Sequence, residues 1–137
     1  MNQVLVGCDQ VFGPWMAGIL GTDWIPGRGH IIGLGDPETG VPAAAAWFEG
    51  FNGASVLCHF ATDGKNRLNR EFLWFMSFYP FEQLKVEKVI SPIESSNLAS
   101  IRWVEKYGMT LEATLKDAAP KGDLLLYTIR KEQCKWL

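Results

Sequence analysis

Apolar residues recur with the period of an α-helix in the middle of the chain. The stripe, with members at i, i+4, i+7, i+8 and i+11, consists of Leu68, Phe72, Phe75, Met76 and Tyr79. This spacing predicts a helix with one buried face. Pro80 should kink or end the helix, because proline lacks an N–H group and its ring clashes with the preceding turn.

Residues 30–61 follow a different pattern, typical of strands. Residues 30–34 and 41–48 are apolar runs separated by a turn-forming segment, residues 36–40. Residues 54–61 alternate, and this alternation places Val56, Cys58 and Phe60 on one face and Leu57 and His59 on the other. Asn52-Gly53 is a hairpin signal between the second and third runs. We therefore expect three consecutive antiparallel strands.

The elements after the long helix alternate between strand and helix. We predict a strand at 86–93, a helix at 98–107, and a final hairpin of residues 109–116 and 124–130 across the turn 120–123. Residues 1–28 are the least regular part, since glycine and proline interrupt every period. For this segment we expect irregular structure with one short helix at 4–12.

The segment 88–109 carries the most specific motif. A strand leads through polar residues, of which Ser95, Ser96 or Asn97 can cap a short helix, and Gly108 ends that helix. The segment resembles the Asn-x-x-Ser/Ala-x-x-x-x-Glu-Lys-x-Gly-Phe signature of the GCN5-related N-acetyltransferases (the GNAT family). The matching residues are Asn97, Ser100, Glu105, Lys106 and Gly108, and Met109 replaces the usual aromatic residue.

The resemblance implies an α/β (α+β) fold, with a mixed, mostly antiparallel central sheet flanked by helices. One domain would span residues 1–137, with its core at 30–130. It also implies acetyl transfer from acetyl-CoA, as cosubstrate, to a primary amine on a small molecule or a protein. The tail, residues 130–137, is similar to that of short stand-alone members of this family in phage and bacterial genomes.

In the family, a glycine-rich loop before the long helix binds the pyrophosphate of acetyl-CoA with backbone amides. The corresponding positions here hold Gly64, Arg67 and Asn69, so all three typical residues of the loop are lost. Cations near the helix start favour a bound anion, but they can also point to water. The cofactor-binding residues that the resemblance implies are Phe60, Ala61, Gly64, Lys65, Asn66, Arg67, Leu68, Asn69 and Asn97, with Arg70 adding a further cation.

Two residues are candidates for the general base, His59 on a central strand and Glu49 at the end of the preceding one. Histidine accepts protons near neutral pH, and Glu49 could act through water. Each also has an ordinary structural interpretation, as a hydrogen-bonded sheet residue or a solvated strand end. Val104 stands where many family members have a tyrosine acid, and Tyr107 is expected to be a core or surface aromatic.

Composition narrows the function classes further. The formal net charge of −2 and the lack of a basic stripe argue against nucleic-acid partners. Three widely spaced cysteines indicate neither a metal site nor a disulfide framework, so we expect a reducing, cytoplasmic location. We expect no membrane partner and no metal, and a homodimer is left open. The alternative function is a non-catalytic GNAT-fold protein that serves in interactions and has lost acetyl-CoA binding.

Overall fold

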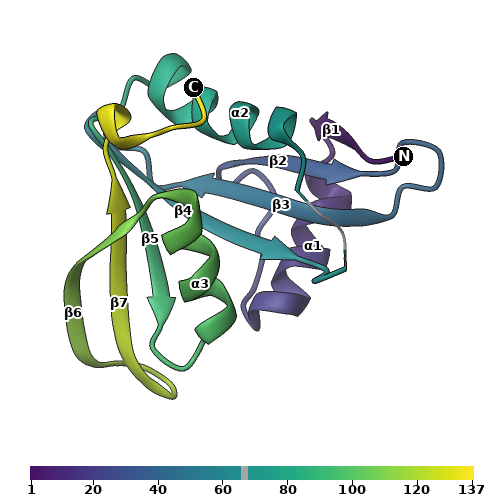
Figure 1. Cartoon of the computed structure of the whole chain (residues 1–137). Helices are drawn as coiled ribbons and strands as arrows, with labels where there is room; N and C mark the ends of the chain where they lie inside the picture. The colour runs from purple at the N-terminus through teal and green to yellow at the C-terminus, as the bar shows by residue number, and fades with distance from the viewer. Residues whose placement is uncertain (66–67) are drawn as a thin grey trace.

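The computed structural model describes residues 1–65 and 68–137. In this part of the chain, a seven-stranded sheet with the order β1-β2-β3-β4-β5-β7-β6 forms the centre (Figure 1). All neighbouring strands run antiparallel except β4 and β5, which are parallel. This confirms the predicted mixed, mostly antiparallel sheet. The strands are β1 (Gln3–Val6), β2 (His30–Gly35), β3 (Pro42–Glu49), β4 (Ser55–Thr62), β5 (Lys88–Glu94), β6 (Thr110–Ala119) and β7 (Gly122–Ile129).

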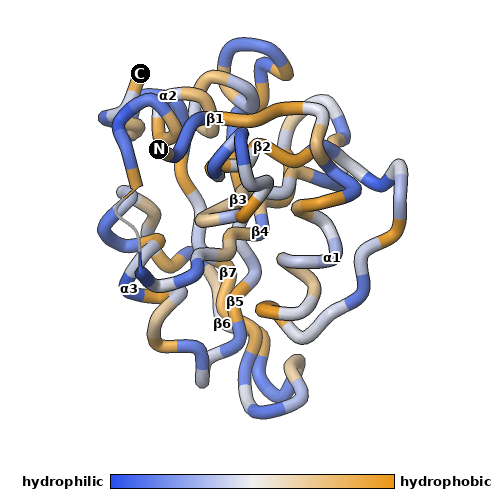
Figure 2. The backbone as a smooth tube through the Cα atoms, turned by 90° about the vertical axis from the view of Figure 1, so that its right-hand side faces the viewer, coloured by the Kyte–Doolittle hydropathy of each residue, from blue (hydrophilic) through white to orange (hydrophobic). Residues whose placement is uncertain are grey.

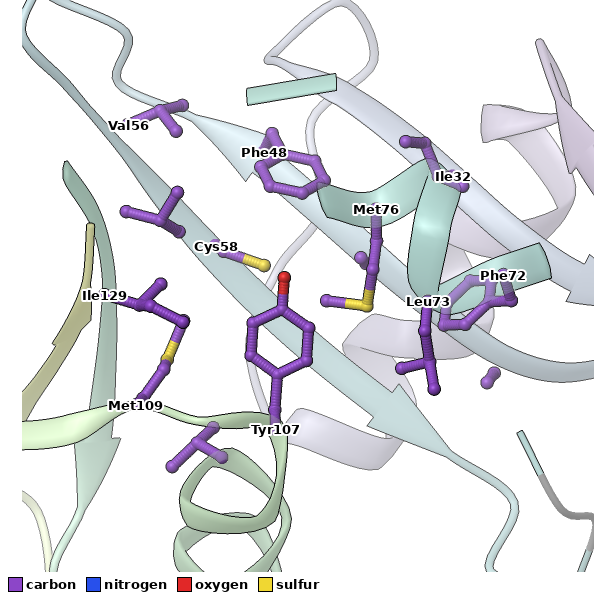
Figure 3. Close-up of a cluster of buried hydrophobic side chains, with 14 of the residues drawn as sticks. Ile32, Phe48, Val56, Cys58, Phe72, Leu73, Met76, Tyr107, Met109 and Ile129 are labelled. Atoms are coloured by element: carbon purple, nitrogen blue, oxygen red, sulfur yellow. The ribbon is translucent and has the colours of Figure 1, made fainter. Parts of the chain in front are cut away.

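Helices cover both faces of the sheet (Figure 2). Helix α1 (Asp9–Leu20) packs Phe12 and Met16 on the face that carries Ile31, Ala45, Trp47 and Ala61. Helices α2 (Arg70–Phe78) and α3 (Leu98–Tyr107) pack on the opposite face. There, side chains from both helices pack with Cys58 of β4, Ile129 of β7 and Met109, which lies just before β6 (Figure 3).

The helix predicted from the apolar stripe is confirmed as α2, and so is its interruption at proline, but Leu68 precedes the helix and Phe75 is exposed. Asn69 caps α2 by accepting from the backbone N–H of Phe72 at 2.7 Å. The α-helix ends at Phe78 and continues as one π-helical turn, η1 (Tyr79–Gln83), which contains the buried Pro80. Helix α3 has the predicted bounds, from its cap Asn97 to Gly108.

For residues 1–28 the expected helix is present, but its bounds were wrong and a strand lies where none was expected. Gln3–Val6 is an edge strand paired with β2, and the helix covers Asp9–Leu20 rather than 4–12. Gly13 and Pro14, which seemed to interrupt any period, lie inside this helix. Gly13 serves packing, because a Cβ there would collide with the indole ring of Trp24. A local pattern cannot reveal that requirement.

Strands β4 and β5 are neighbours, but they separate along their length. Their pairing joins Ser55–Leu57 to Lys88–Ile90 and stops there, although both strands continue. Beyond this point the Ser91 hydroxyl donates to the Cys58 carbonyl at 2.9 Å, so a side chain replaces a backbone bond. The result is an opening in the middle of the sheet.

Candidate functional site

A small pocket of about 60 Å³ occupies the opening between β4 and β5. Leu20 and His59 reach it from the α1 face of the sheet, while α3 borders it on the other face. The remaining lining residues are Cys58, Phe60, Ser91, Pro92, Ile93, Asn97, Ser100, Trp103 and Val104. The pocket therefore brings polar groups of both faces to one gap.

His59 and Glu49 form a hydrogen-bonded pair beside this pocket. The β3–β4 register sets Trp47 opposite His59 and Glu49 opposite Leu57, so the two polar side chains are diagonal neighbours on the α1 face. Glu49 Oε2 lies 2.7 Å from His59 Nε2. A carboxylate only accepts, so the neutral imidazole donates from Nε2 and keeps a lone pair on Nδ1.

Arg28 contacts the other oxygen of the Glu49 carboxylate. Its Nε lies 3.0 Å from Glu49 Oε1, so the carboxylate uses one oxygen for each neighbour. The Arg28 carbonyl accepts from Trp47 Nε1 at 2.7 Å, and the Trp47 and His59 rings lie 4.9 Å apart. Sequence reasoning missed Arg28 because only the register of distant strands brings it to Glu49.

A second, larger pocket of about 660 Å³ lies on the α3 side. It is lined by Thr62, Gly64, Leu68, Leu73, Trp103, Lys106, Tyr107, Lys135 and Trp136. Among the described residues, Lys106 and Lys135 take part in none of the ion pairs. Two cations thus stand beside an open, partly aromatic hollow, a combination suited to an anionic ligand with an aromatic ring.

The predicted cofactor-binding residues divide between several places. Phe60 and Asn97 line the small pocket, and Gly64 and Leu68 line the large one. Ala61 does not join them with its side chain, which is buried on the α1 face.

Two other predicted residues, Lys65 and Asn69, lie at the loop itself. Asn69 caps α2, as noted above, and the backbone N–H of Lys65 bonds to Asp63 Oδ1 at 2.9 Å. Asn66 and Arg67 lie outside the described residues, so the anion site predicted from Lys65, Arg67 and Arg70 remains a prediction.

Asn97 has a structural role as well as a place in the pocket. Its Oδ1 accepts from the backbone N–H of Ser100 at 3.2 Å, which caps α3. Among the described residues the side-chain NH₂ of Asn97 donates no hydrogen bond, so it remains able to donate to a ligand. Both interpretations of Asn97 are therefore compatible in one side chain.

Trp103 separates the two pockets and lines both. Its ring stacks on Phe60 of β4 with centroids 3.6 Å apart and an angle of 13° between planes. Tyr107 follows one turn later at 5.5 Å, and Trp136 lies beyond it at 6.3 Å. The sequence offered only the i, i+4 spacing of Trp103 and Tyr107 as a signal, because Phe60 and Trp136 lie on distant segments.

The residues near the usual acid position belong to the core. Val104 is buried, and burial raises the pKa of Tyr107 well above its usual value. The Tyr107 hydroxyl shares a hydrogen bond with Oγ of Ser77 in α2. Figure 3 shows Tyr107 among the buried side chains of the core. Burial also raises the pKa of the Cys58 thiol to about 12. Val104 has no titratable group, and neither the Tyr107 hydroxyl nor the Cys58 thiol is suited to donate or exchange a proton at neutral pH.

Neither a cluster of metal-ligand side chains nor a helix that could span a membrane is found in the part of the chain that the structure describes. Residues 1–65 and 68–137 contain no group of three or more His, Cys, Asp or Glu side chains arranged to hold a metal ion. No helix within the same residues has the length and apolar character needed to cross a membrane.

Comparison with solved structures identifies the fold. A scan against models of known protein families and a search of curated proteins both find no match. A mutant of the spermidine N-acetyltransferase SpeG from Vibrio cholerae matches all of this chain and 97% of its own, with 14% identity and a TM-score of 0.73. Other SpeG mutant forms, described as a spermidine/spermine N-acetyltransferase, match with 10% identity and coverages of 96% and 94%, again at 0.73.

A GNAT-family acetyltransferase from Bacillus anthracis gives a TM-score of 0.61 at 19% identity. That match covers 74% of this chain, which spans 66% of the Bacillus protein. At these identities the likeness concerns the fold. The chain has the GNAT fold, and the resemblance predicted from Asn97 to Gly108 is confirmed at that level.

Proposed function

We propose, on the premise of this GNAT fold, that the protein transfers an acetyl group from acetyl-CoA to a primary amine. The observation that carries the proposal is the gap between β4 and β5, where a histidine held by a carboxylate reaches a pocket that also opens toward α3. A residue at position 59 that served only to pack the core would not need a carboxylate partner such as Glu49.

The residues fit acetyl-CoA in two respects. Beyond Leu57 the β4–β5 pairing ends, so backbone amides on that side of β4 are available to an acyl oxygen. Lys106 and Lys135 beside the large pocket suit the phosphates, and they offset the loss of the typical loop residues. Asn97 would contact the pantetheine arm. Bound there, acetyl-CoA would supply the acetyl group as an activated thioester.

We assign each step of proton transfer to a particular group. His59 Nδ1 takes a proton from the incoming amine, and Glu49 holds the imidazole in the tautomer that can do so. Glu49 is thus a positioning residue rather than a base that acts through water. Since Val104 and Tyr107 are unsuited as acids, the thiolate would take its proton from solvent. Positioning of both reactants would supply much of the rate.

A second candidate function is a non-catalytic protein of the same fold. The Phe60–Trp103 stack favours it, because these rings lie between the two pockets where an extended arm would pass. The experiment that separates the candidates is acetyl transfer to a panel of primary amines, with release of free thiol as the readout. Thiol release that depends on both the amine and His59 supports the enzyme, and its absence supports the alternative.

A further inference from the structure

Pro92 stands at an unusual place, within an interior strand of the sheet. Prolines in sheets are normally confined to edge strands and bulges, because proline has no N–H to donate to a neighbouring strand. β5 lies between β4 and β7, and Pro92 pairs with Leu126 of β7. The side to which its missing N–H would point therefore decides which pairing loses a bond.

The missing N–H of Pro92 faces β4. Alternate residues of a strand direct their N–H groups to the same neighbour, and the Lys88 N–H donates to the Ala54 carbonyl, just before β4, at 3.3 Å. Even-numbered residues of β5 thus bond toward β4. The odd-numbered Ser95, directly after β5, donates to the Asp123 carbonyl of β7 at 2.9 Å. The proline therefore costs the β5–β7 pairing no bond.

The register identifies the bond that β4 loses. Leu57 and Ile90 form the last pair of the two strands. The next step sets Cys58 opposite Ser91, where the Cys58 carbonyl would accept from the N–H of residue 92. Proline has no such group, and the pairing ends at this step.

Ser91 supplies the donor that Pro92 lacks. Its buried hydroxyl donates to the Cys58 carbonyl at 2.9 Å. A side chain reaches further than a backbone N–H, so the carbonyl is satisfied while the two strands stand apart. An unpaired buried carbonyl would be costly. Two adjacent residues thus remove a backbone bond and compensate for its loss.

We infer that Pro92 is a positioning residue for acetyl transfer, which keeps the gap between β4 and β5 open by withholding a donor from Cys58. This inference rests on the proposed function. The alternation along β4 directs the Phe60 N–H to the same side as the Cys58 carbonyl, beyond the last pair. Continued pairing would engage that N–H with β5, whereas the open gap leaves it to an acyl oxygen. Cys58, Phe60, Ser91 and Pro92 all line the pocket at this gap.

A double-mutant cycle tests the exchange of donors without any substrate. Ser91→Ala leaves the Cys58 carbonyl without a donor and should lower the midpoint of denaturant unfolding. In a Pro92→Ala background the new N–H can donate instead, so Ser91→Ala should lower the midpoint much less. The effect of proline on the unfolded chain cancels, because Pro92→Ala is present in both proteins of that second comparison. The new amide at position 92 should also be protected from hydrogen exchange.

The catalytic role is tested by acetyl transfer to the amine that the wild-type protein acetylates fastest. In Pro92→Ala, kcat should fall on the order of a hundredfold, the loss typical of one oxyanion donor. The unfolding midpoint should fall no more than in the matched control Pro42→Ala, which replaces a proline at the start of β3 and should keep the wild-type rate. A proline that served only stability would lose rate together with stability.

Three results would overturn the inference. Equal midpoint losses for Ser91→Ala in both backgrounds would show that the strands separate for another reason, as would an unprotected amide at position 92. A wild-type rate in Pro92→Ala would show that transfer does not need the gap that Pro92 maintains. If Pro92→Ala fails to fold, Pro92→Val, which suits a strand, replaces it in every comparison. Absence of acetyl transfer by the wild-type protein would instead reject the proposed function, and the positioning role with it.

Discussion

His59 and Glu49 are joined by a hydrogen bond beside the pocket between β4 and β5. Separately, a strand histidine and a glutamate at a strand end are common features of sheets. Their 2.7 Å contact makes Nε2 the donor nitrogen of the neutral imidazole, and His59 also lines the pocket. We propose that Glu49 orients His59 and that His59 accepts the proton.

Replacing His59 by Gln should lower kcat/KM for acetyl transfer on the order of a hundredfold or more, since general base catalysis contributes about 10²–10⁴. Glu49→Gln should cause a smaller loss, because it weakens the orientation and leaves the imidazole in place. The control is His30→Gln, at the start of β2 against the ring of Tyr79, which should leave the rate unchanged. Full activity in His59→Gln would remove the assigned base.

Asn97 can be separated into its two roles by substitution. Asn97→Ala removes the α3 cap and should destabilise the protein by about 1 kcal/mol in chemical denaturation. Asn97→Asp keeps an accepting oxygen and should retain stability. Both variants lack the side-chain N–H donor, so both should bind CoA more weakly in calorimetric titration. Unaltered CoA affinity in Asn97→Asp would show that this residue only caps its helix.

At the scale of elements, α3 and β4 control the connection between the two pockets. The strands separate after Leu57, but Trp103 from α3 fills part of the opening by stacking on Phe60. Stacked aromatic pairs contribute about 0.5–1.5 kcal/mol beyond their burial, an amount that ligand binding can offset. The stack is therefore compatible with an enzyme whose helix side chain moves when the cosubstrate binds.

Binding of CoA should change the fluorescence of Trp103, because the ligand would replace its contact with Phe60. Trp103→Phe should reduce that change and leave only the contribution of Trp136, which also lines the large pocket. Trp74→Phe, at an exposed position on α2, is the control and should preserve the signal. A change of the same size in Trp103→Phe as in the wild type would show that the ligand leaves the contact between Trp103 and Phe60 in place.

At the scale of the whole molecule, local signals in the sequence predicted the elements from residue 30 onward. Helix α3 was predictable to the residue because its cap, its apolar face and its terminating glycine are all local. Helix α1 was not predictable in the same way. Gly13 is required there because the ring of Trp24, which only the folded chain brings close, leaves no room for a Cβ.

The candidate site was predictable only as separate parts. His59 and Glu49 could be named from residue type and strand position, whereas their pairing depends on the β3–β4 register. Arg28 and Trp103 contact partners on distant segments, and the large pocket brings Lys106 and Lys135 together from two separate segments. Such residues can be recognised as part of the site only after the fold has brought these segments together.

We predict that the protein binds CoA across the gap between β4 and β5. Calorimetric titration of the wild-type protein with acetyl-CoA and with free CoA tests this prediction most directly. We predict saturable binding of both at one site, with dissociation constants below about 1 mM, equivalent to more than about 4 kcal/mol. No heat of binding with either compound at millimolar concentration would contradict the account and leave the non-catalytic function in its place.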